Sequence, residues 1–222
     1  MQRFNQELEL GISDGSEINR RTAFHEAGHA AAIYLENRRK NLPLIYFQIQ
    51  TRKYNSQATP FFSEICGGRQ ISDALMIGGK SSTGRCDCTD ITGFTVAYEA
   101  DIINFLAGPL AEAKYECLRS HEVFNINVLR PDALKNYGGN ADLKEVWFYL
   151  RSFLPSLQEQ ERKLNELFSE AFHFIQEFDN WKHIVALAQY IFDSTEEFIC
   201  YEQVNQVFNQ YKQYTGIQSG RL

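Results

Sequence analysis

The chain has 222 residues, of which 44% are hydrophobic and 23% are charged, and this composition is typical of a folded globular protein rather than a disordered one. Its formal net charge of −6 argues against a nucleic-acid surface, because phosphate binding needs a concentrated basic face and the short basic run 38–40 does not supply one. No stretch approaches the roughly 18 consecutive apolar residues of a membrane span, and the N-terminus lacks the apolar segment of a signal peptide. We therefore expect a cytoplasmic protein without a transmembrane segment.

The predicted elements of the first half are one helix and two strands. Apolar residues recur at helical spacing from the turn at 14–16 to about Glu36, which predicts a helix. The stretches 44–50 (LIYFQIQ) and 91–98 (ITGFTVAY) are rich in β-branched and aromatic residues, which favours strands. Residues 54–90 are rich in Gly, Ser, Thr and Asn and show no sustained period, so we expect loops there.

The second half is predicted to be helical. Helical spacing returns at 99–119, with a bend expected at Gly108-Pro109, and Asn140 is placed to cap the helix that follows it. Residues 157–178, 180–192 and 197–214 predict three further helices that close the fold.

The first helix carries the sequence HEAGH at residues 25–29. Each helical residue advances about 100°, so His25 and His29 lie one turn apart on the same face and can share one metal ion. This HExxH spacing is a zinc-peptidase signature in which the glutamate, here Glu26, holds a zinc-bound water and acts as the general base. The alternative is a structural helix that places two histidines one turn apart by chance.

Catalytic zinc usually has three protein ligands, so the sequence must supply one more. A metzincin extension would need Gly at position 32 and His at position 35, but the chain has Ala32 and Leu35 there. Several candidates for the third ligand remain, namely Glu112, Glu116, Asp142, and a Cys or His between residues 86 and 121.

Three other patterns are weaker. Residues 74–81 (ALMIGGKS) resemble a phosphate-binding loop but lack its first glycine and a leading strand, so a plain loop is favoured. Cys86 and Cys88 lack a nearby partner pair for a second metal, and Cys117 and His121 are interpreted as structural. The odd count of five cysteines in a chain without export signals predicts free thiols.

Taken together, the motifs resemble the peptidase domain of the FtsH family of membrane-bound, ATP-dependent zinc proteases. That family shows HEAGHA, then a strand, then a helix of the type LAGRAAEE, then a helix opening near GAxNDL. Here the same order reads HEAGHA (25–30), LIYFQIQ (44–50), FLAGPLAEAKYE (105–116) and GGNADLKEV (138–146). The resemblance spans most of the chain.

The resemblance implies a single domain over 1–222, with an α+β, mainly α-helical fold. Residues 1–150 would form the HExxH zinc-metallopeptidase core with a small β-sheet and an insertion near 54–90, and residues 151–222 would form a C-terminal helical bundle. It also implies that Asp142, together with His25 and His29, binds zinc. Glu112 then becomes a group that orients a ligating imidazole.

The function that follows is a zinc metalloendopeptidase in which Glu26 is catalytic and the substrate is an unfolded or flexible polypeptide. An extended substrate is expected to add along the edge of the 44–50 strand. We expect neither the family's membrane anchor nor its ATPase module within this chain, so a homo-oligomer and an ATPase supplied in trans are left open as partners. The alternative is a non-catalytic zinc-binding interaction module with the same fold.

Overall fold

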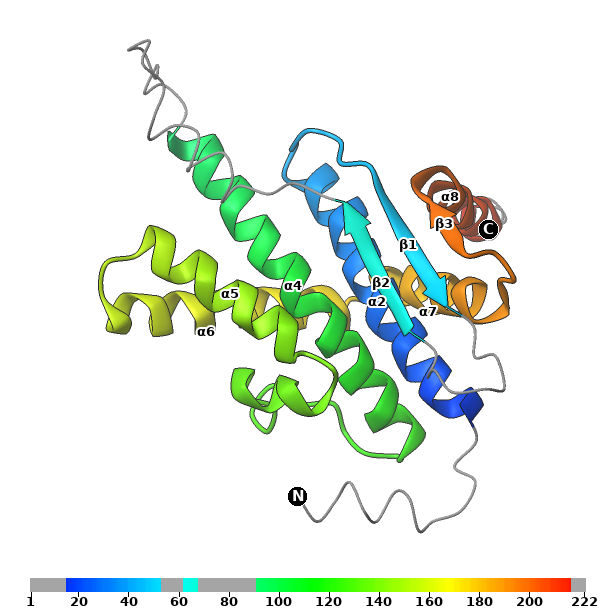
Figure 1. Ribbon diagram of the computed structural model, residues 1–222, viewed down its shortest axis with the longest axis horizontal. Coiled ribbons are helices and arrows are strands. Elements are labelled where there is room, and N and C mark those ends of the chain that lie inside the picture. The colour runs from blue at the N-terminus through cyan, green and yellow to red at the C-terminus, as the bar shows by residue number, and fades with distance from the viewer. Residues whose placement is uncertain (1–14, 53–61, 68–90, 217–222) are drawn as a thin grey trace, which may run out of the picture.

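The computed structural model describes residues 15–52, 62–67 and 91–216 (Figure 1). The described chain is mainly α-helical, with one small antiparallel sheet. Thus the predicted mixture of many helices and a small sheet is confirmed. The structure describes only 62–67 of the predicted insertion near 54–90. The loop 74–81 and the pair Cys86 and Cys88 lie outside the described residues.

Two long helices form the centre of the molecule. Helix α2 (Gly15–Arg39) carries the HEAGH motif, and α4 (Ile91–Arg119) lies beside it (Figure 1). The two helices approach closely because small side chains line their contact: a β-carbon at Gly28 would lie only 2.5 Å from the carbonyl oxygen of Ala107 and 2.7 Å from the β-carbon of Ala111. Five alanines on α2 are fully buried in the core, namely Ala23, Ala27, Ala30, Ala31 and Ala32.

The prediction of a strand at 91–98 is wrong, since these residues form the first turns of α4. The aromatic side chain that favoured a strand is buried between helices instead: the ring of Tyr98 lies 4.0 Å from that of Phe153 and 6.1 Å from that of Tyr149, centroid to centroid. Tertiary packing has thus overridden the local strand preference. Helix α4 also continues past Pro109 to Arg119.

The sheet has the strand order β2-β1-β3. Strand β1 (Phe47–Arg52) is central and pairs antiparallel with β2 (Phe62–Gly67) and with β3 (Phe198–Cys200). Ile49 lies opposite Ile65 on one side and Ile199 on the other. Both edges of β1 are therefore occupied, so the prediction that a substrate pairs with this strand is wrong. The strand also begins three residues later than predicted.

The remaining helices follow in chain order, namely the 3₁₀ helix η2 (Pro131–Asn136), α5 (Asn140–Phe153), α6 (Leu157–Gln176), α7 (Phe178–Asp193) and α8 (Tyr201–Gly216). Ser156 caps α6, since its hydroxyl accepts a hydrogen bond from the Glu159 amide at 3.3 Å. Asn140 was predicted to cap α5, but it is the first helical residue and Gly139 holds the cap position without a side-chain bond. Gly139 fits because a β-carbon there would lie 2.9 Å from that of Pro109.

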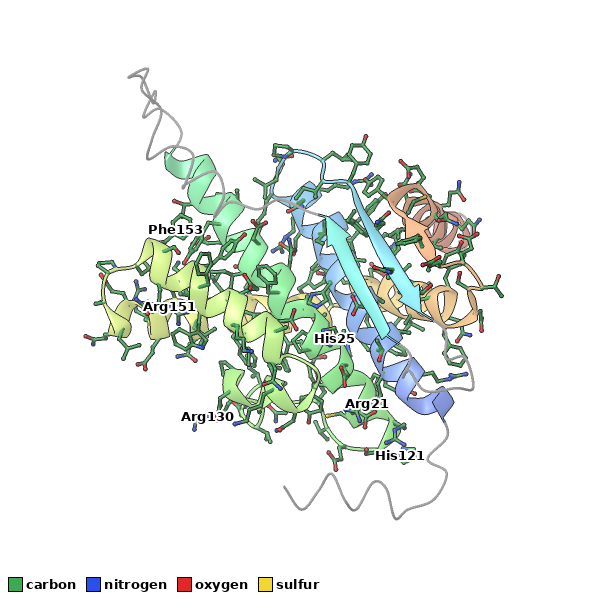
Figure 2. All side chains as sticks on the ribbon, viewed as in Figure 1. Arg21, His25, His121, Arg130, Arg151 and Phe153 are labelled. Carbon is green, nitrogen blue, oxygen red and sulfur yellow. The ribbon has the colours of Figure 1, made fainter. Side chains whose placement is uncertain are left out.

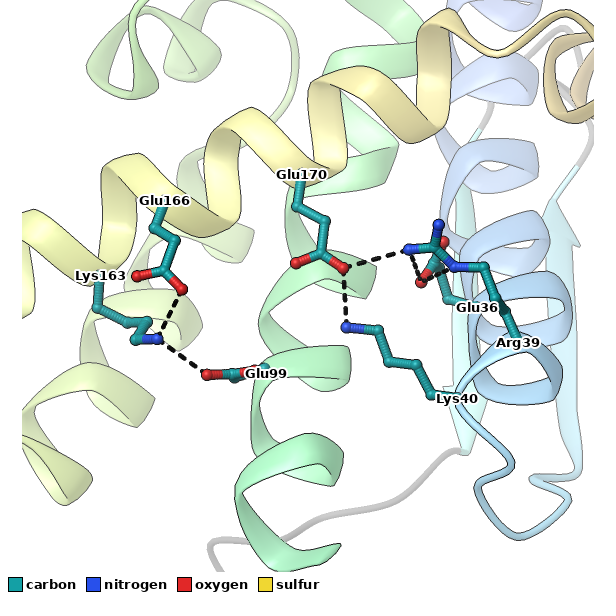
Figure 3. A network of polar contacts seen from close by, with 7 residues as sticks. All are labelled: Glu36, Arg39, Lys40, Glu99, Lys163, Glu166 and Glu170. Atoms are coloured by element: carbon teal, nitrogen blue, oxygen red, sulfur yellow. Dashed lines mark hydrogen bonds and ion pairs between the residues drawn. The ribbon is translucent and has the colours of Figure 1, made fainter. Parts of the chain in front are cut away.

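The C-terminal helices share one core with the central pair, because α6 packs on α4, α7 packs on α2, and β3 completes the sheet. Ion pairs reinforce these contacts (Figure 3). The ammonium of Lys163 on α6 lies 2.9 Å from the carboxylate of Glu99 on α4. Glu170 on α6 binds Lys40 at 2.9 Å and Arg39 at 3.2 Å, which ties α6 to the C-terminal end of α2. These contacts fix the orientation of the helix that carries HEAGH.

Within the described ranges, no helix combines the length and apolar character that crossing a membrane requires. Cys117 and Cys200 carry free thiols, as predicted.

Candidate metal centre

The two histidines of HEAGH meet an aspartate from a distant helix. His25 and His29 lie on α2, and Asp142 lies in the first turn of α5. One ligand atom from each of the three side chains lies within 4.8 Å of the others, and in the described part of the chain this is the one group of its kind. The three side chains are only 11%, 12% and 14% exposed. A buried cluster of two imidazoles and one carboxylate can hold a metal ion.

The imidazoles are oriented for ligation. The Nε2 atoms of both rings face Asp142, at 3.4 Å from Oδ2 for His25 and 3.2 Å from Oδ1 for His29. The Nδ1 atoms point the other way: that of His25 lies 3.0 Å from Glu112 Oε2, and that of His29 lies 2.7 Å from the main-chain oxygen of Asn104. Each Nδ1–H can thus donate to an oxygen of α4, which leaves the Nε2 lone pairs for a metal ion.

A cation on the far side of Glu112 completes this arrangement. Arg21 donates to Glu112 Oε1 from Nη2 at 2.9 Å and from Nε at 3.2 Å, and its Nε lies 3.4 Å from Glu116. Arg21 and His25 are one helical turn apart on α2, so a row of contacts runs Arg21, Glu112, His25 (Figure 2 labels the two α2 residues). The guanidinium offsets the cost of burying the Glu112 carboxylate and holds it against the ring.

The electrostatics of the cluster favour positive charge. Burial by itself lowers the pKa of His25, but hydrogen bonds with Asp142 and Glu112 and the charge of Glu26 outweigh it and raise that pKa to about 10. Burial by itself raises the pKa of Asp142, whereas the charges and hydrogen bonds of His29 and His25 hold it well below its usual range. The site thus attracts positive charge, which a proton or a metal ion can provide. Because a ligating imidazole must be neutral, a metal ion competes with the proton on His25.

Two glycines make room for the imidazoles. A methyl group at Gly108 on α4 would overlap the ring of His29. Gly138 has a φ of +74°, which favours glycine, and a β-carbon there would lie 3.0 Å from both His25 Nδ1 and Glu112 Oε2. The loop that leads into α5 can therefore pass directly over the hydrogen bond between His25 and Glu112.

Glu26 follows His25 on α2 and is 6% exposed. Its charge contributes to the raised pKa of His25, so its carboxylate lies close to the cluster without belonging to the group of three ligand atoms. This is the placement expected of a carboxylate that handles protons beside a metal ion.

The sequence-predicted residues thus separate into two groups. His25, His29 and Asp142 come together, with Glu26 and Glu112 beside them. Glu116, an alternative third ligand, contacts Arg21 and Arg119 instead. Cys117 and His121 lie outside the cluster.

Sequence reasoning missed Asn104 and Gly108 as parts of the site. Asn104 acts through its main-chain oxygen, which every residue has, so the sequence carries no signal for it. Gly108 was noticed only as part of an expected bend, although a glycine within a helix is itself a sign of close packing.

Neither a protein-family model nor a curated protein sequence matches the chain. The case for a metal centre therefore rests on the contacts described above.

Proposed function

We propose that this protein is a zinc-dependent metalloendopeptidase that hydrolyses peptide bonds in flexible polypeptides. The observation that carries the proposal is the convergence of His25, His29 and Asp142, with Glu26 as a buried carboxylate beside them. Two imidazole nitrogens and one carboxylate oxygen are a donor set that zinc adopts in hydrolases, and three protein ligands leave a coordination position open. The resemblance to the FtsH peptidase domain supports the same assignment.

In this proposal each residue has one task. His25, His29 and Asp142 would hold the zinc ion, which when bound supplies a Lewis acid and lowers the pKa of water. Glu26 removes a proton from the attacking water, the water oxygen bonds to the carbonyl carbon, and the carbon–nitrogen bond breaks. Glu26 then returns the proton to the leaving amine nitrogen. Glu112 and the main-chain oxygen of Asn104 keep the imidazoles turned toward the ion.

The test combines metal analysis with proteolysis. We expect about one zinc per chain in the purified protein and chelator-sensitive cleavage of unfolded casein. Glu26→Gln should keep the zinc and lose cleavage by at least about 100-fold, because it removes the general base alone. Asp142→Ala should lose both the zinc and the activity.

The outcomes separate the alternatives. Zinc at one per chain without any cleavage would replace the peptidase by a non-catalytic zinc-binding interaction module. A purified protein without zinc, or full activity in Glu26→Gln, would overturn the proposal.

A further inference from the structure

A groove of about 890 Å³ lies between η2, α5 and α6, and none of the three residues of the metal cluster lines it. This volume is within the range of sites that bind small molecules or peptide segments. Helix α5 lies between this groove and the metal cluster: its first turn directs Asp142 toward His25 and His29, while Asn140 and Lys144, about half a turn around the helix from Asp142, line the groove.

The floor of the groove is apolar. Leu143 and Trp147 of α5 and Ile126 and Leu129 before η2 are partly buried against the core, so each keeps apolar surface open to the groove. Leu164 and Phe168 of α6 close the floor from below and are almost fully buried. Such a surface takes up large apolar side chains.

The rim of the groove is basic, although the chain carries a net charge of −6. Four cationic side chains line it, namely Arg130, Lys135, Lys144 and Arg151, against two carboxylates, Asp132 and Glu161. Figure 2 labels Arg130 and Arg151, which lie on the same side of the molecule in this view.

These cationic side chains make little contribution to ion pairs within the protein. In the part of the chain that the structure describes, Lys135, Lys144 and Arg151 have no ion-pair partner. Arg130 lies 3.7 Å from Asp132, but both side chains are highly exposed, at 83% and 76%, and such a pair is weak. The positive charge is thus available to a ligand.

We infer that this groove binds polypeptide segments in which carboxylate side chains alternate with large apolar ones, and that it selects such segments as substrates. The apolar floor would take the apolar side chains, and the basic rim would bind the carboxylates and speed encounter. The inference rests on the proposed peptidase function for what happens to the bound segment, but binding itself requires no hydrolysis.

The first experiment measures binding to zinc-loaded Glu26→Gln protein by fluorescence anisotropy. The probes are a short labelled peptide of glutamate with leucine and phenylalanine, a second in which lysine replaces glutamate, and a third in which serine replaces the apolar residues. We expect the first peptide to bind at least about tenfold more tightly than the other two. Equal binding of the lysine peptide would overturn the inference, and so would displacement of the first peptide by a single-stranded oligonucleotide.

The groove itself is tested by charge reversal. Lys144→Glu combined with Arg151→Glu should weaken binding of the acidic peptide by at least about tenfold. In the matched control, Arg119 and Arg162 are both replaced by glutamate; these side chains are 49% and 70% exposed and lie outside the groove. This control should bind the acidic peptide with the parent's affinity. Circular dichroism and zinc content check that both double variants are folded. Equal binding by the groove variant and the parent would overturn the inference.

Peptidase assays with otherwise wild-type protein then distinguish the two proposals. The groove variant should raise KM for an acidic, apolar peptide with little change in kcat, because it removes binding that is remote from the reacting bond. If the acidic peptide binds in a groove-dependent way but no peptide is cleaved, the proposed peptidase function is overturned and the proposed binding site is kept. If the groove variant cleaves the acidic, apolar peptide with the parent's KM and kcat, the groove is not a substrate site, and the peptidase proposal still stands.

Discussion

Gly108 lies directly against the imidazole of His29, so that a single methyl group on this α-carbon would overlap the ring. The ring is held on its other side by the hydrogen bond from Nδ1 to the Asn104 oxygen, one turn earlier on the same helix. Helix α4 therefore both anchors and confines the second histidine of HEAGH.

The first prediction follows from this contact. Gly108→Ala should push His29 out of line with Asp142 and weaken zinc binding by at least about tenfold, although alanine favours a helix over glycine by about 1 kcal/mol. Zinc affinity is measured by competition with a chromophoric chelator, and thermal unfolding is followed in parallel.

Gly28→Ala is the matched comparison. Its β-carbon would meet the main-chain oxygen of Ala107 rather than an imidazole, so this change should lower stability by separating α2 from α4. If Gly108→Ala binds zinc with the parent's affinity, then His29 is not confined as described.

Some parts of the fold and of the site could be predicted from the sequence, and others could not. The pairing of His25 with His29 follows from helical geometry alone, because four residues make about one turn. Asp142 was one of several candidates on that basis, since its contact with α2 joins residues more than one hundred positions apart, and the resemblance to a family selected it.

The errors have physical causes. The first turns of α4 contain β-branched and aromatic residues that favour a strand, but Tyr98 finds its partners on α5, and a local pattern contains no information about them. Strand β3 has three residues and exists because β1 offers it a free edge, so its own sequence was absorbed into the helix that follows.

The second prediction concerns the row Arg21, Glu112, His25. Glu112→Gln keeps a hydrogen-bond acceptor for His25 but removes the negative charge, and loss of such a partner typically weakens metal binding by about 10- to 100-fold. Arg21→Met should have a smaller effect in the same direction, since Glu112 would lose the cation that donates two hydrogen bonds to its Oε1. Zinc affinity is again the readout, with Glu122→Gln, an exposed carboxylate outside the cluster, as the control. Equal affinities in Glu112→Gln and Glu122→Gln would contradict the role of this row.

The third prediction concerns stability. A ligand that binds only the folded protein stabilises it by about 2.7 kcal/mol at a free concentration one hundred times its Kd, so zinc should raise the unfolding temperature and a chelator should lower it. Asp142→Asn should abolish most of the zinc-dependent shift. His121→Asn should leave it intact, because His121 lies outside the cluster and its φ of +58° suits asparagine. A similar zinc-dependent shift in both variants would place the metal elsewhere.

The last prediction uses a buried lysine away from the metal cluster. Lys114 on α4 donates a hydrogen bond to the Ile175 oxygen at 2.7 Å and lies 4.3 Å from the ring of Trp181, and burial lowers its pKa to about 8. The unfolded chain therefore binds more protons than the folded one between this value and the ordinary pKa near 10.5. Across that window the stability contributed by Lys114 rises with pH, whereas below about pH 8 the full cost of burying the charge is present.

Lys114→Met removes this cost together with the hydrogen bond. The stability of the wild type relative to the variant should thus increase by about 1–2 kcal/mol between pH 8 and pH 10, measured by urea unfolding of both proteins at each pH. Taking the difference cancels groups that titrate in both proteins, such as Cys117 and Tyr98, whose pKa values burial raises. A difference that stays constant over this range would mean that Lys114 keeps its proton in the folded protein, and that the Ile175 oxygen and the Trp181 ring compensate fully for its burial.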